Sequence, residues 1–401
     1  MQHEAPRHRR RFGVAEMLSR RELIKGTLAT PFAIAPNKAF GTQSLKIGAI
    51  LPFSGGQELI GNQAKLGIDL AITEINAAGG VLGSPIEVVY QDDQTDPKTA
   101  VERAITLIQR ETVAAIVGPI LSPARDANLA IHRRHKVALL YGASFEGGSC
   151  DQYLFNFGTS PNQELDALLT ELQSQAGNDF YLFGADIAWG QKLFPKAEKV
   201  ITEHGGTVVA KELTALNTTD FTTSIRRIRE SGAKVVIQAF PGSRGLSFLK
   251  QAEDLGLFGK VTFACVGFSE SSLGAFGPGQ GEDIWVETPF VSTLDQPAIR
   301  DFVSRAKSGS PSGFVTRYVV SHYNAIKAVA AAASGKKSSA REDILAGLSG
   351  LEIDSPTGQL TVDPVNHCVN QSMFLAKTEK GSLRVVKSVG NIRADAGCAL
   401  L

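Results

Sequence analysis

Short runs of consecutive apolar residues recur along the chain and predict strands. They are rich in Val, Ile and Phe and do not alternate with polar residues, which is typical of strands buried on both faces of a sheet. The runs occupy residues 45–53, 85–93, 113–119, 137–143, 180–186, 206–213, 234–242 and 261–268.

Helical patterns separate these runs. In residues 96–111, Asp96 suits the N-cap and Pro97 the first helical position, and the apolar residues then fall on one face. A second pattern over 61–80 ends in Gly79-Gly80, which tolerate positive φ. Strand followed by helix, repeated, predicts parallel sheets with helices on both faces. Because the set occurs twice, with a seam near 155–165, the sequence predicts two doubly wound α/β lobes.

Ligands of such sheets bind outside the carboxyl ends of the strands. The residues that follow the predicted strands are therefore the candidates for a site. They are Ser54–Gly56, Asp92-Asp93, Gly118–Ser122, Tyr141–Ser144, Asp186–Trp189 and Phe240–Arg244.

Three aspartates, Asp92, Asp93 and Asp96, lie within five residues and could bind a divalent cation. A calcium loop needs more oxygen ligands at fixed offsets and a glycine turn. We therefore interpret the three as a strand end followed by a helix cap, and we expect no metal.

Motifs of nucleotide-dependent and hydrolytic enzymes are missing from the sequence. There is no GxxxxGK[ST] loop and no GxSxG elbow, and the glycines of Phe276–Asp283 do not open a helix after a strand. We expect a protein that is not an enzyme and that has no cofactor.

The charge distribution singles out the N-terminus. The chain has 41 Lys and Arg against 40 Asp and Glu. Residues 1–41 hold eight of the basic and three of the acidic residues, which leaves 33 against 37 for 42–401, a net charge of −4. A mildly acidic body has no electrostatic footprint for nucleic acid.

Residues 1–41 have the order of an export signal. Arg20-Arg21 precede a short apolar run that ends in small residues near Ala39-Phe40-Gly41, and this resembles a twin-arginine signal. The alternative is a basic amphipathic tail, and translation could start at Met1 or Met17. No other run is long enough to span a membrane, so we expect a periplasmic protein that does not itself span the membrane.

Four cysteines, Cys150, Cys265, Cys368 and Cys398, do not have the CxxC spacing typical of zinc sites. In an exported protein two of them could pair, but the sequence does not give the connectivity.

Several ordered motifs together resemble one family. "IGAILPFSG", "GNQAKLGIDLAITEINAAGGVLGSPIEVVYQDDQTDP", "AAIVGPILSPA" and "VALLYGAS" are similar to the Leu/Ile/Val-binding-protein family, the type I periplasmic solute-binding proteins of ABC importers. "FYLFGADIAWGQK" and "IDSPTGQLTVDPVNHC" are most similar to its urea- and short-amide-binding branch. The resemblance implies two lobes joined by three crossovers, one formed by 45–157 plus 288–371 and the other by 158–287 plus 372–401.

The same resemblance implies ligand-binding residues. Ser122 matches a serine that meets the ligand, and Ala143 and Ser144 match a loop that offers a backbone N–H and a hydroxyl. Tyr141 matches a cleft tyrosine, and Trp189 matches an aromatic lid. Phe240 and Arg244 complete the predicted set from the end of a strand in the second lobe.

Some positions depart from the pattern. Ile120 and Ile187 stand where amide-binding relatives have tyrosines. Arg244 stands where amino-acid binders carry a carboxylate, so it would repel a ligand ammonium and attract a ligand carboxylate; alternatively it points to solvent. The ligand class therefore stays open among urea, short amides, amino acids and small carboxylates.

Two function classes follow. We expect the exported substrate-binding component of an ABC importer, with a small polar solute and a membrane permease as its partners. The alternative is a cytoplasmic amide-type sensor that regulates gene expression, for which an export signal has no use.

Overall fold

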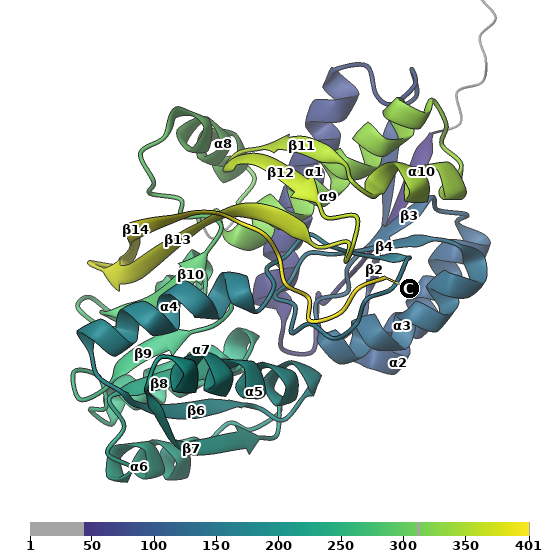
Figure 1. The fold of residues 1–401 in the computed structure, drawn as a ribbon. Coiled ribbons are helices and arrows are strands. Elements are labelled where there is room, and N and C mark those ends of the chain that lie inside the picture. Colours follow the sequence, from purple (N-terminus) through teal and green to yellow (C-terminus); the bar gives the residue numbers. More distant parts are fainter. Residues whose placement is uncertain (1–43, 311–312, 401) are drawn as a thin grey trace, which may run out of the picture. The chain divides into compact units, whose positions relative to one another are not determined.

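The first sheet is formed by the N-terminal strands of the chain, β1 to β5. The computed structural model describes residues 44–310 and 313–400, and Figure 1 shows the arrangement of the elements. Five parallel strands lie in the order β2-β1-β3-β4-β5. Their bounds are β1 Leu45–Leu51, β2 Ile86–Asp92, β3 Ala115–Val117, β4 Ala138–Tyr141 and β5 Leu154–Asn156. This is a doubly wound order, in which neighbouring connections diverge between β1 and β3.

Helices cover both faces of this sheet. In Figure 1, α2 and α3 lie on one side and α1, α9 and α10 on the other. One continuous apolar core joins them to the strands. The bounds are α1 Glu58–Ala77, α2 Pro97–Ile105 with a π-helical turn Thr106–Arg110, α3 Ser122–His135, α8 Pro297–Lys307, α9 Arg317–Lys336 and α10 Arg341–Leu348.

The second sheet repeats the order and then extends it. Its strands lie in the order β11-β12-β13-β10-β9-β8-β6-β7, and β14 pairs with β13. The parallel part, β7-β6-β8-β9-β10, has the same doubly wound order as the first sheet. The bounds are β6 Asp179–Ala185, β7 Thr207–Thr214, β8 Val235–Ala239, β9 Thr262–Cys265, β10 Ile284–Thr288, β11 Glu352–Ser355, β12 Gly358–Val362, β13 Val369–Glu379 and β14 Ser382–Ile392.

Two further cores lie on the two faces of the second sheet. Leucines of α4 and apolar residues of α5 pack on one face. Residues of α6, of α7 and of the 3₁₀ turn Glu270–Ala275 pack on the other. The helices are α4 Asn162–Gln175, α5 Ala188–Glu203, α6 Thr222–Glu230 and α7 Gly242–Asp254. The predicted α/β fold with two doubly wound sheets is thus confirmed.

The chain leaves the first sheet after β5 and later returns to it. Most buried apolar residues from Phe290 to Val369 belong to the core of the first sheet, as do Ala394 and Ala396 of the tail. The sequence had placed residues 372–401 in the second lobe. Ala394 and Ala396 pack in the core of the first sheet instead. The reason is that the tail after β14 turns back toward that core.

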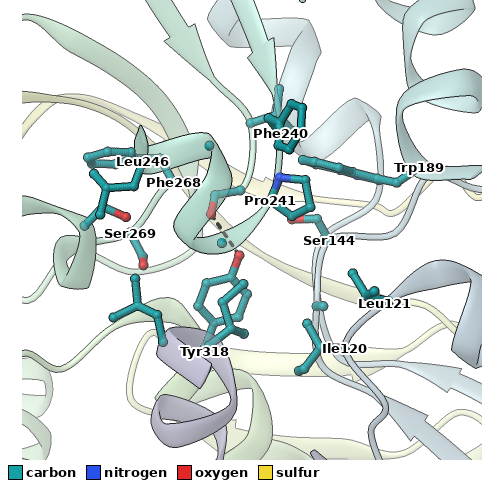
Figure 2. A pocket seen from close by; sticks show the side chains of 18 of the residues that line it. Ile120, Leu121, Ser144, Trp189, Phe240, Pro241, Leu246, Phe268, Ser269 and Tyr318 are labelled. Atoms are coloured by element: carbon teal, nitrogen blue, oxygen red, sulfur yellow. Dashed lines mark hydrogen bonds between the residues drawn. The ribbon is translucent and has the colours of Figure 1, made fainter. Parts of the chain in front are cut away.

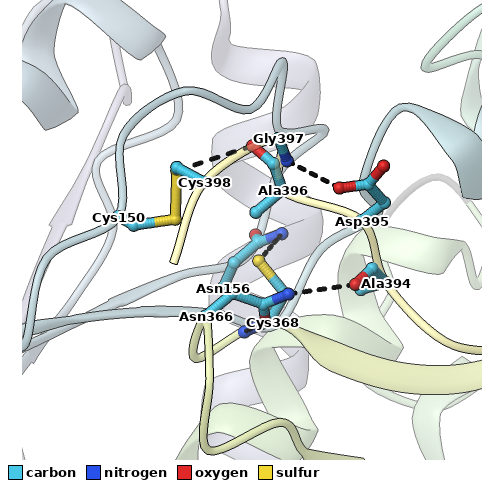
Figure 3. The surroundings of a disulfide bond; sticks show 9 residues. All are labelled: Cys150, Asn156, Asn366, Cys368, Ala394, Asp395, Ala396, Gly397 and Cys398. Carbon is cyan, nitrogen blue, oxygen red and sulfur yellow. Dashed lines mark hydrogen bonds between the residues drawn. A yellow bond between two sulfur atoms is a disulfide. The ribbon is translucent and has the colours of Figure 1, made fainter. Parts of the chain in front are cut away.

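A disulfide holds this returning tail. Cys150 pairs with Cys398, and Figure 3 shows the tail beside the loop that contains Cys150. Gly148 N donates to Ala396 O at 2.8 Å, and Asn366 Nδ2 donates to Ala394 O at 3.0 Å. Cys265 and Cys368 are free thiols, both buried. The pairing that the sequence left open is therefore Cys150 with Cys398.

Asp92, Asp93 and Asp96 accept hydrogen bonds from backbone N–H groups at a strand end and a helix cap, as the sequence predicted. Asp96 caps α2, since its carboxylate accepts from Thr99 N at 2.7 Å. Asp92 accepts from the backbone N–H groups of Phe53 and Gln94, each at 2.9 Å, and Asp93 accepts from Thr95 N at 2.9 Å. Each carboxylate thus fixes a turn at the end of β1 or β2.

No helix in the described part of the chain is long and apolar enough to cross a bilayer. The predicted export signal, residues 1–41, lies outside the described residues.

Candidate functional site

A cavity opens at the carboxyl ends of strands from both sheets. Its volume is about 60 Å³, room for a few water molecules. Most of the wall is apolar, and Figure 2 shows part of it. The lining residues are Leu59, Ile60, Ile120, Leu121, Ser122, Tyr141, Ala143, Ser144, Ile187, Trp189, Gln238, Phe240, Pro241, Gly242, Gly245, Leu246, Leu249, Val266, Gly267, Phe268, Ser269, Ser272 and Tyr318.

The fold brings most of the predicted site residues to this one cavity. Ser122 begins α3, Tyr141 ends β4, and Ala143 and Ser144 follow in the next loop. From the second sheet, Trp189 lies in the first turn of α5, and Phe240 follows β8. Their roles toward a ligand remain predictions.

Arg244 is the exception. It lies in the first turn of α7 and is half-buried, but it is not among the residues that line the cavity. Of the two alternatives that the sequence left open, contact of Arg244 with the cavity gains no support here, and we do not propose Arg244 as a ligand contact.

Several lining residues were missed by the sequence analysis. Phe268 and Ser269 follow β9, so the strand-end rule that found the other positions applies equally to them. Tyr318 comes from α9, more than 170 residues after β4. Nothing in the local pattern of a long buried helix marks one tyrosine as a cavity residue, so no sequence signal could have found it.

Two buried ion pairs stand behind the polar part of the wall. Arg125 and Glu146, both 0% exposed, form a bidentate pair with N–O distances of 2.6 and 3.0 Å. Ser122 Oγ donates to the same carboxylate at 2.8 Å. Burial by itself raises the pKa of Glu146, but the charge and hydrogen bonds of Arg125 outweigh it and hold that pKa below its usual value.

The second pair is built in the same way. Arg317 Nη1 lies 2.6 Å from Glu164 Oε1, and Ser144 Oγ donates to that oxygen at 2.9 Å. All three side chains are buried. Ser122 and Ser144 are therefore each hydrogen-bonded to a carboxylate that an arginine holds from behind.

Helix N-termini also converge on the cavity. Leu121 and Ser122 lie at the start of α3, Ile187 and Trp189 at the start of α5, and Pro241 and Gly242 at the start of α7. None of these three helices has a side-chain N-cap hydrogen bond in the described structure. Uncapped first-turn N–H groups carry partial positive charge, so these helix starts favour a negatively charged group.

One more donor is unused. The indole Nε1 of Trp189 is buried and has no hydrogen-bond partner among the described residues. Buried donors are nearly always paired in native proteins. A solute oxygen is the partner that this lining position suggests.

Two hydrogen bonds join the halves of the molecule that contain the two sheets. Tyr318 Oη, from α9, donates to Gly267 O after β9 at 2.8 Å, as the dashed line in Figure 2 marks. Ser243 Oγ, in α7, donates to Gly56 O before α1 at 2.9 Å. The two halves are therefore in direct contact beside the cavity.

Ionisable groups do not gather here as a metal or catalytic cluster. Among the described lining residues none is Asp, Glu, Lys, Arg or His. No group of three or more His, Cys, Asp or Glu in the described part of the chain is placed to hold a metal ion.

Known proteins of similar sequence are binding proteins. The chain is 27% identical over 366 residues to Leu/Ile/Val-binding protein homolog 6 of Brucella melitensis, covering 88% of this chain and 92% of that protein. It is also 27% identical over 343 residues to homolog 8 of Brucella abortus, covering 79% and 82%.

Solved structures of similar fold come with different ligands. A solute-binding protein of an ABC transporter from Rhodopseudomonas palustris, in complex with p-hydroxybenzoic acid, has a TM-score of 0.80 at 24% identity, covering 88% of this chain and 98% of that one. A branched-chain amino-acid transporter binding protein from Streptococcus pneumoniae, in complex with isoleucine, has a TM-score of 0.76 at 22% identity, covering 87% and 99%.

The periplasmic binding protein family matches residues 44–382, nearly the whole described chain. Its two-sheet fold and the cavity at the strand ends agree with that match. The chain therefore belongs to the periplasmic binding protein family, whose members bind solutes and are not enzymes.

Proposed function

We propose that this protein captures a small carboxylate with an apolar body, aromatic or branched, and delivers it to the membrane permease of an ABC importer. The observation that carries the proposal is the combination of an apolar wall with three uncapped helix N-termini. An apolar wall accommodates a hydrocarbon body, and first-turn N–H groups stabilise a carboxylate.

The volume restricts the ligand to a small one. An apolar protein cavity of about 150 Å³ holds a benzene molecule, and the cavity here, at about 60 Å³, is smaller. The R. palustris protein named above binds a ring of the size of benzene that carries a carboxylate.

The other ligand classes suit the cavity less well. Urea and short amides would leave most of its apolar surface without contact. The ammonium group of an amino acid needs a carboxylate partner, and no Asp or Glu is present among the described residues of the wall. The resemblance to the amide-binding branch therefore does not extend to the ligand that we propose.

Titration calorimetry of the purified protein tests the proposal. The panel is benzoate, 4-methylpentanoate, leucine, urea and acetamide. We expect at least one of the two carboxylates to bind with micromolar affinity, about −8 kcal/mol, and urea and acetamide not to bind. Tighter binding of leucine, urea or acetamide than of both carboxylates would overturn it.

Export to the periplasm is the second part of the proposal. The family is periplasmic, and residues 1–41 have the order of a signal. The Cys150–Cys398 disulfide supports it, because disulfides persist in oxidising compartments and are rare in the cytosol. A cytoplasmic sensor would not need either feature.

A further inference from the structure

Four serines line the cavity, and the hydroxyl protons of two of them, Ser122 and Ser144, have a fixed direction. Ser122 donates to Glu146 at 2.8 Å and Ser144 donates to Glu164 at 2.9 Å. An ionised carboxylate can only accept hydrogen bonds. Each of these two hydroxyls therefore donates its single proton to the carboxylate behind it. Toward a solute it can then only accept a hydrogen bond, through an oxygen lone pair.

The ion pairs hold these carboxylates in place. The Arg125 guanidinium lies over the rings of both Tyr141 and Phe145, at 4.9 and 4.8 Å from their centroids. Arg317 contacts Glu164, and its Nη2 also donates to Ser144 Oγ at 3.3 Å. Buried charge-assisted bonds of this kind are short and strong, so the serines do not reorient at low cost.

Ser122 and Ser144 consequently face helix-start N–H groups of the other half; Ser269 and Ser272 also line that other half, and their hydroxyls can donate or accept. The starts of α5 and α7 and the indole of Trp189 supply N–H groups from the half of the second sheet. Ser122 and Ser144 supply oxygen acceptors from the half of the first sheet. The start of α3 adds fewer donors than α5 or α7, because Pro123 in its first turn has no N–H.

We propose that Ser122 and Ser144 are specificity-determining acceptors, positioned by Arg125–Glu146 and Arg317–Glu164, and that the solute carries a hydrogen-bond donor such as a hydroxyl on its apolar body. The inference rests on the proposed carboxylate class and narrows it to hydroxy- or N–H-bearing members. It also gives a direction to the Ser144 hydroxyl, which the sequence-based expectation offered to the ligand without one.

Matched pairs of probes separate a donor from an acceptor of similar size. We would titrate the full-length mature protein with 3- and 4-hydroxybenzoate and with 3- and 4-fluorobenzoate. A hydroxyl can donate, whereas fluorine cannot. In the wild type we expect one hydroxybenzoate to bind roughly tenfold or more tightly than its fluoro counterpart, the effect of one hydrogen bond at a buried site.

Serine variants then locate the acceptor. Ser122→Ala, Ser144→Ala and the double variant should lower the hydroxy-to-fluoro ratio, and the double variant should bring it below about threefold. The control is Ser224→Ala, which removes a serine-to-glutamate bond of the same kind, Ser224 Oγ to Glu212 Oε1 at 2.6 Å. Ser224 lies in α6 and does not line the cavity, so its ratio should equal that of the wild type.

Glu146→Gln tests the positioning role. The amide that this change introduces can donate from its nitrogen to Ser122 Oγ, which frees the serine proton to turn toward the cavity. We expect the hydroxy-to-fluoro ratio to fall although the serine is still present, a change of selectivity that a loss of packing alone would not produce. If this variant does not fold because Arg125 loses its charge partner, the affinity ratios of the serine variants still test whether Ser122 and Ser144 accept from the solute.

The outcomes are distinct. Equal or tighter binding of the fluorobenzoates by the wild type overturns the inference, and so does an unchanged ratio in the Ser122→Ala/Ser144→Ala double variant. If none of the four probes nor benzoate binds, the aromatic carboxylate class is wrong, and the inference that rests on it falls with it.

Discussion

Gly142 lies where a side chain has no room. A Cβ at this position would come closer than 3.0 Å to three atoms of the His322 ring, and that ring is buried and bonded through Nδ1 to Tyr318 O at 2.8 Å. Gly142 immediately precedes Ala143 and Ser144, so its contact with α9 sets the position of the loop that forms one wall of the cavity.

We therefore expect Gly142→Ala to lower the free energy of unfolding by roughly 1–3 kcal/mol through overpacking, and to weaken solute binding. Gly335→Ala in the same helix, α9, is the control, because a Cβ there meets nothing within 4 Å. That change should be neutral or stabilise by up to roughly 1 kcal/mol. Urea denaturation measures both, and equal midpoints for the two variants would contradict the steric argument.

Buried carboxyls give the protein a particular pH dependence. Burial raises the pKa of Glu287 to about 8 and that of Glu270 to about 7. In the unfolded chain both titrate near 4.5. Between these values the folded protein binds more protons than the unfolded chain, so stability falls as pH rises. Below pH 6.5 the buried histidines His132, His322 and His367, with pKa values of about 4, act in the opposite direction.

The window for the test is therefore pH 6.5 to 8. The free energy of unfolding should decrease across it, by up to about 1.4 kcal/mol per pH unit for each group. Glu287→Gln keeps the shape and still accepts from Leu168 N, which now bonds to Glu287 at 3.1 Å, but it removes one titration. The variant should show a flatter slope in denaturation curves at several pH values; a slope equal to that of the wild type would rule out Glu287 as the source.

Residue types alone did not reveal the groups that orient the serines. Arg125 stands in "SPARDAN", a polar helical stretch that suggests a solvated face. Its full burial depends on Glu146, 21 residues later and across the β4 loop. Such a pair is decided by tertiary structure, whereas Asp96 as a helix cap depends on its neighbours only and was predicted correctly.

The elements show the same division. The parallel strands from β1 to β9, apart from short β5, were predicted because strands buried on both faces leave continuous apolar runs. The antiparallel strands β13 and β14 were missed. Leu383 is the one buried position of β14. Neither the strand period nor an apolar run therefore marks this strand, and only pairing with β13 defines it.

The tail beyond β14 is an element held by a covalent bond. The disulfide links residues 248 positions apart, and restricting so long a loop in the unfolded chain stabilises the folded state by roughly 2–5 kcal/mol in typical cases. We expect Cys398→Ser to lower the melting temperature. A reducing agent should lower the melting temperature of the wild type to that of the variant. It should leave the melting temperature of the variant unchanged, because Cys398→Ser has already removed the disulfide.

Thiol labelling provides the control for this experiment. Cys265 and Cys368 are buried, so under native conditions the oxidised wild type should label poorly, and Cys398→Ser should gain one reactive thiol at Cys150. An unchanged melting temperature in wild type whose Cys150 has become labelled would show that the bond does not stabilise the fold.

At the scale of the whole molecule, delivery to the periplasm is the condition for transport. We expect Arg20→Lys combined with Arg21→Lys to block export, because the paired arginines define the proposed twin-arginine signal. Cell fractionation measures the result. Normal export of the double variant would argue against this route, and a wild type found in the cytoplasm would remove the export proposal altogether.

The contact between the two halves of the molecule should also affect stability when a solute binds. Tyr318–Gly267 and Ser243–Gly56 join the two halves directly. A solute that fills the cavity adds its own contacts to both halves, so binding should raise the melting temperature with solute concentration, by mass action.

The bond between Cys150 and Cys398 has one more consequence. It turns residues 150–398 into a covalent ring that contains the whole second sheet. A protease that cuts this ring once, in any exposed loop, cannot separate the fragments. On a gel without reductant the nicked protein should keep its full mass, and in the periplasm a single cut would leave a solute carrier in one piece.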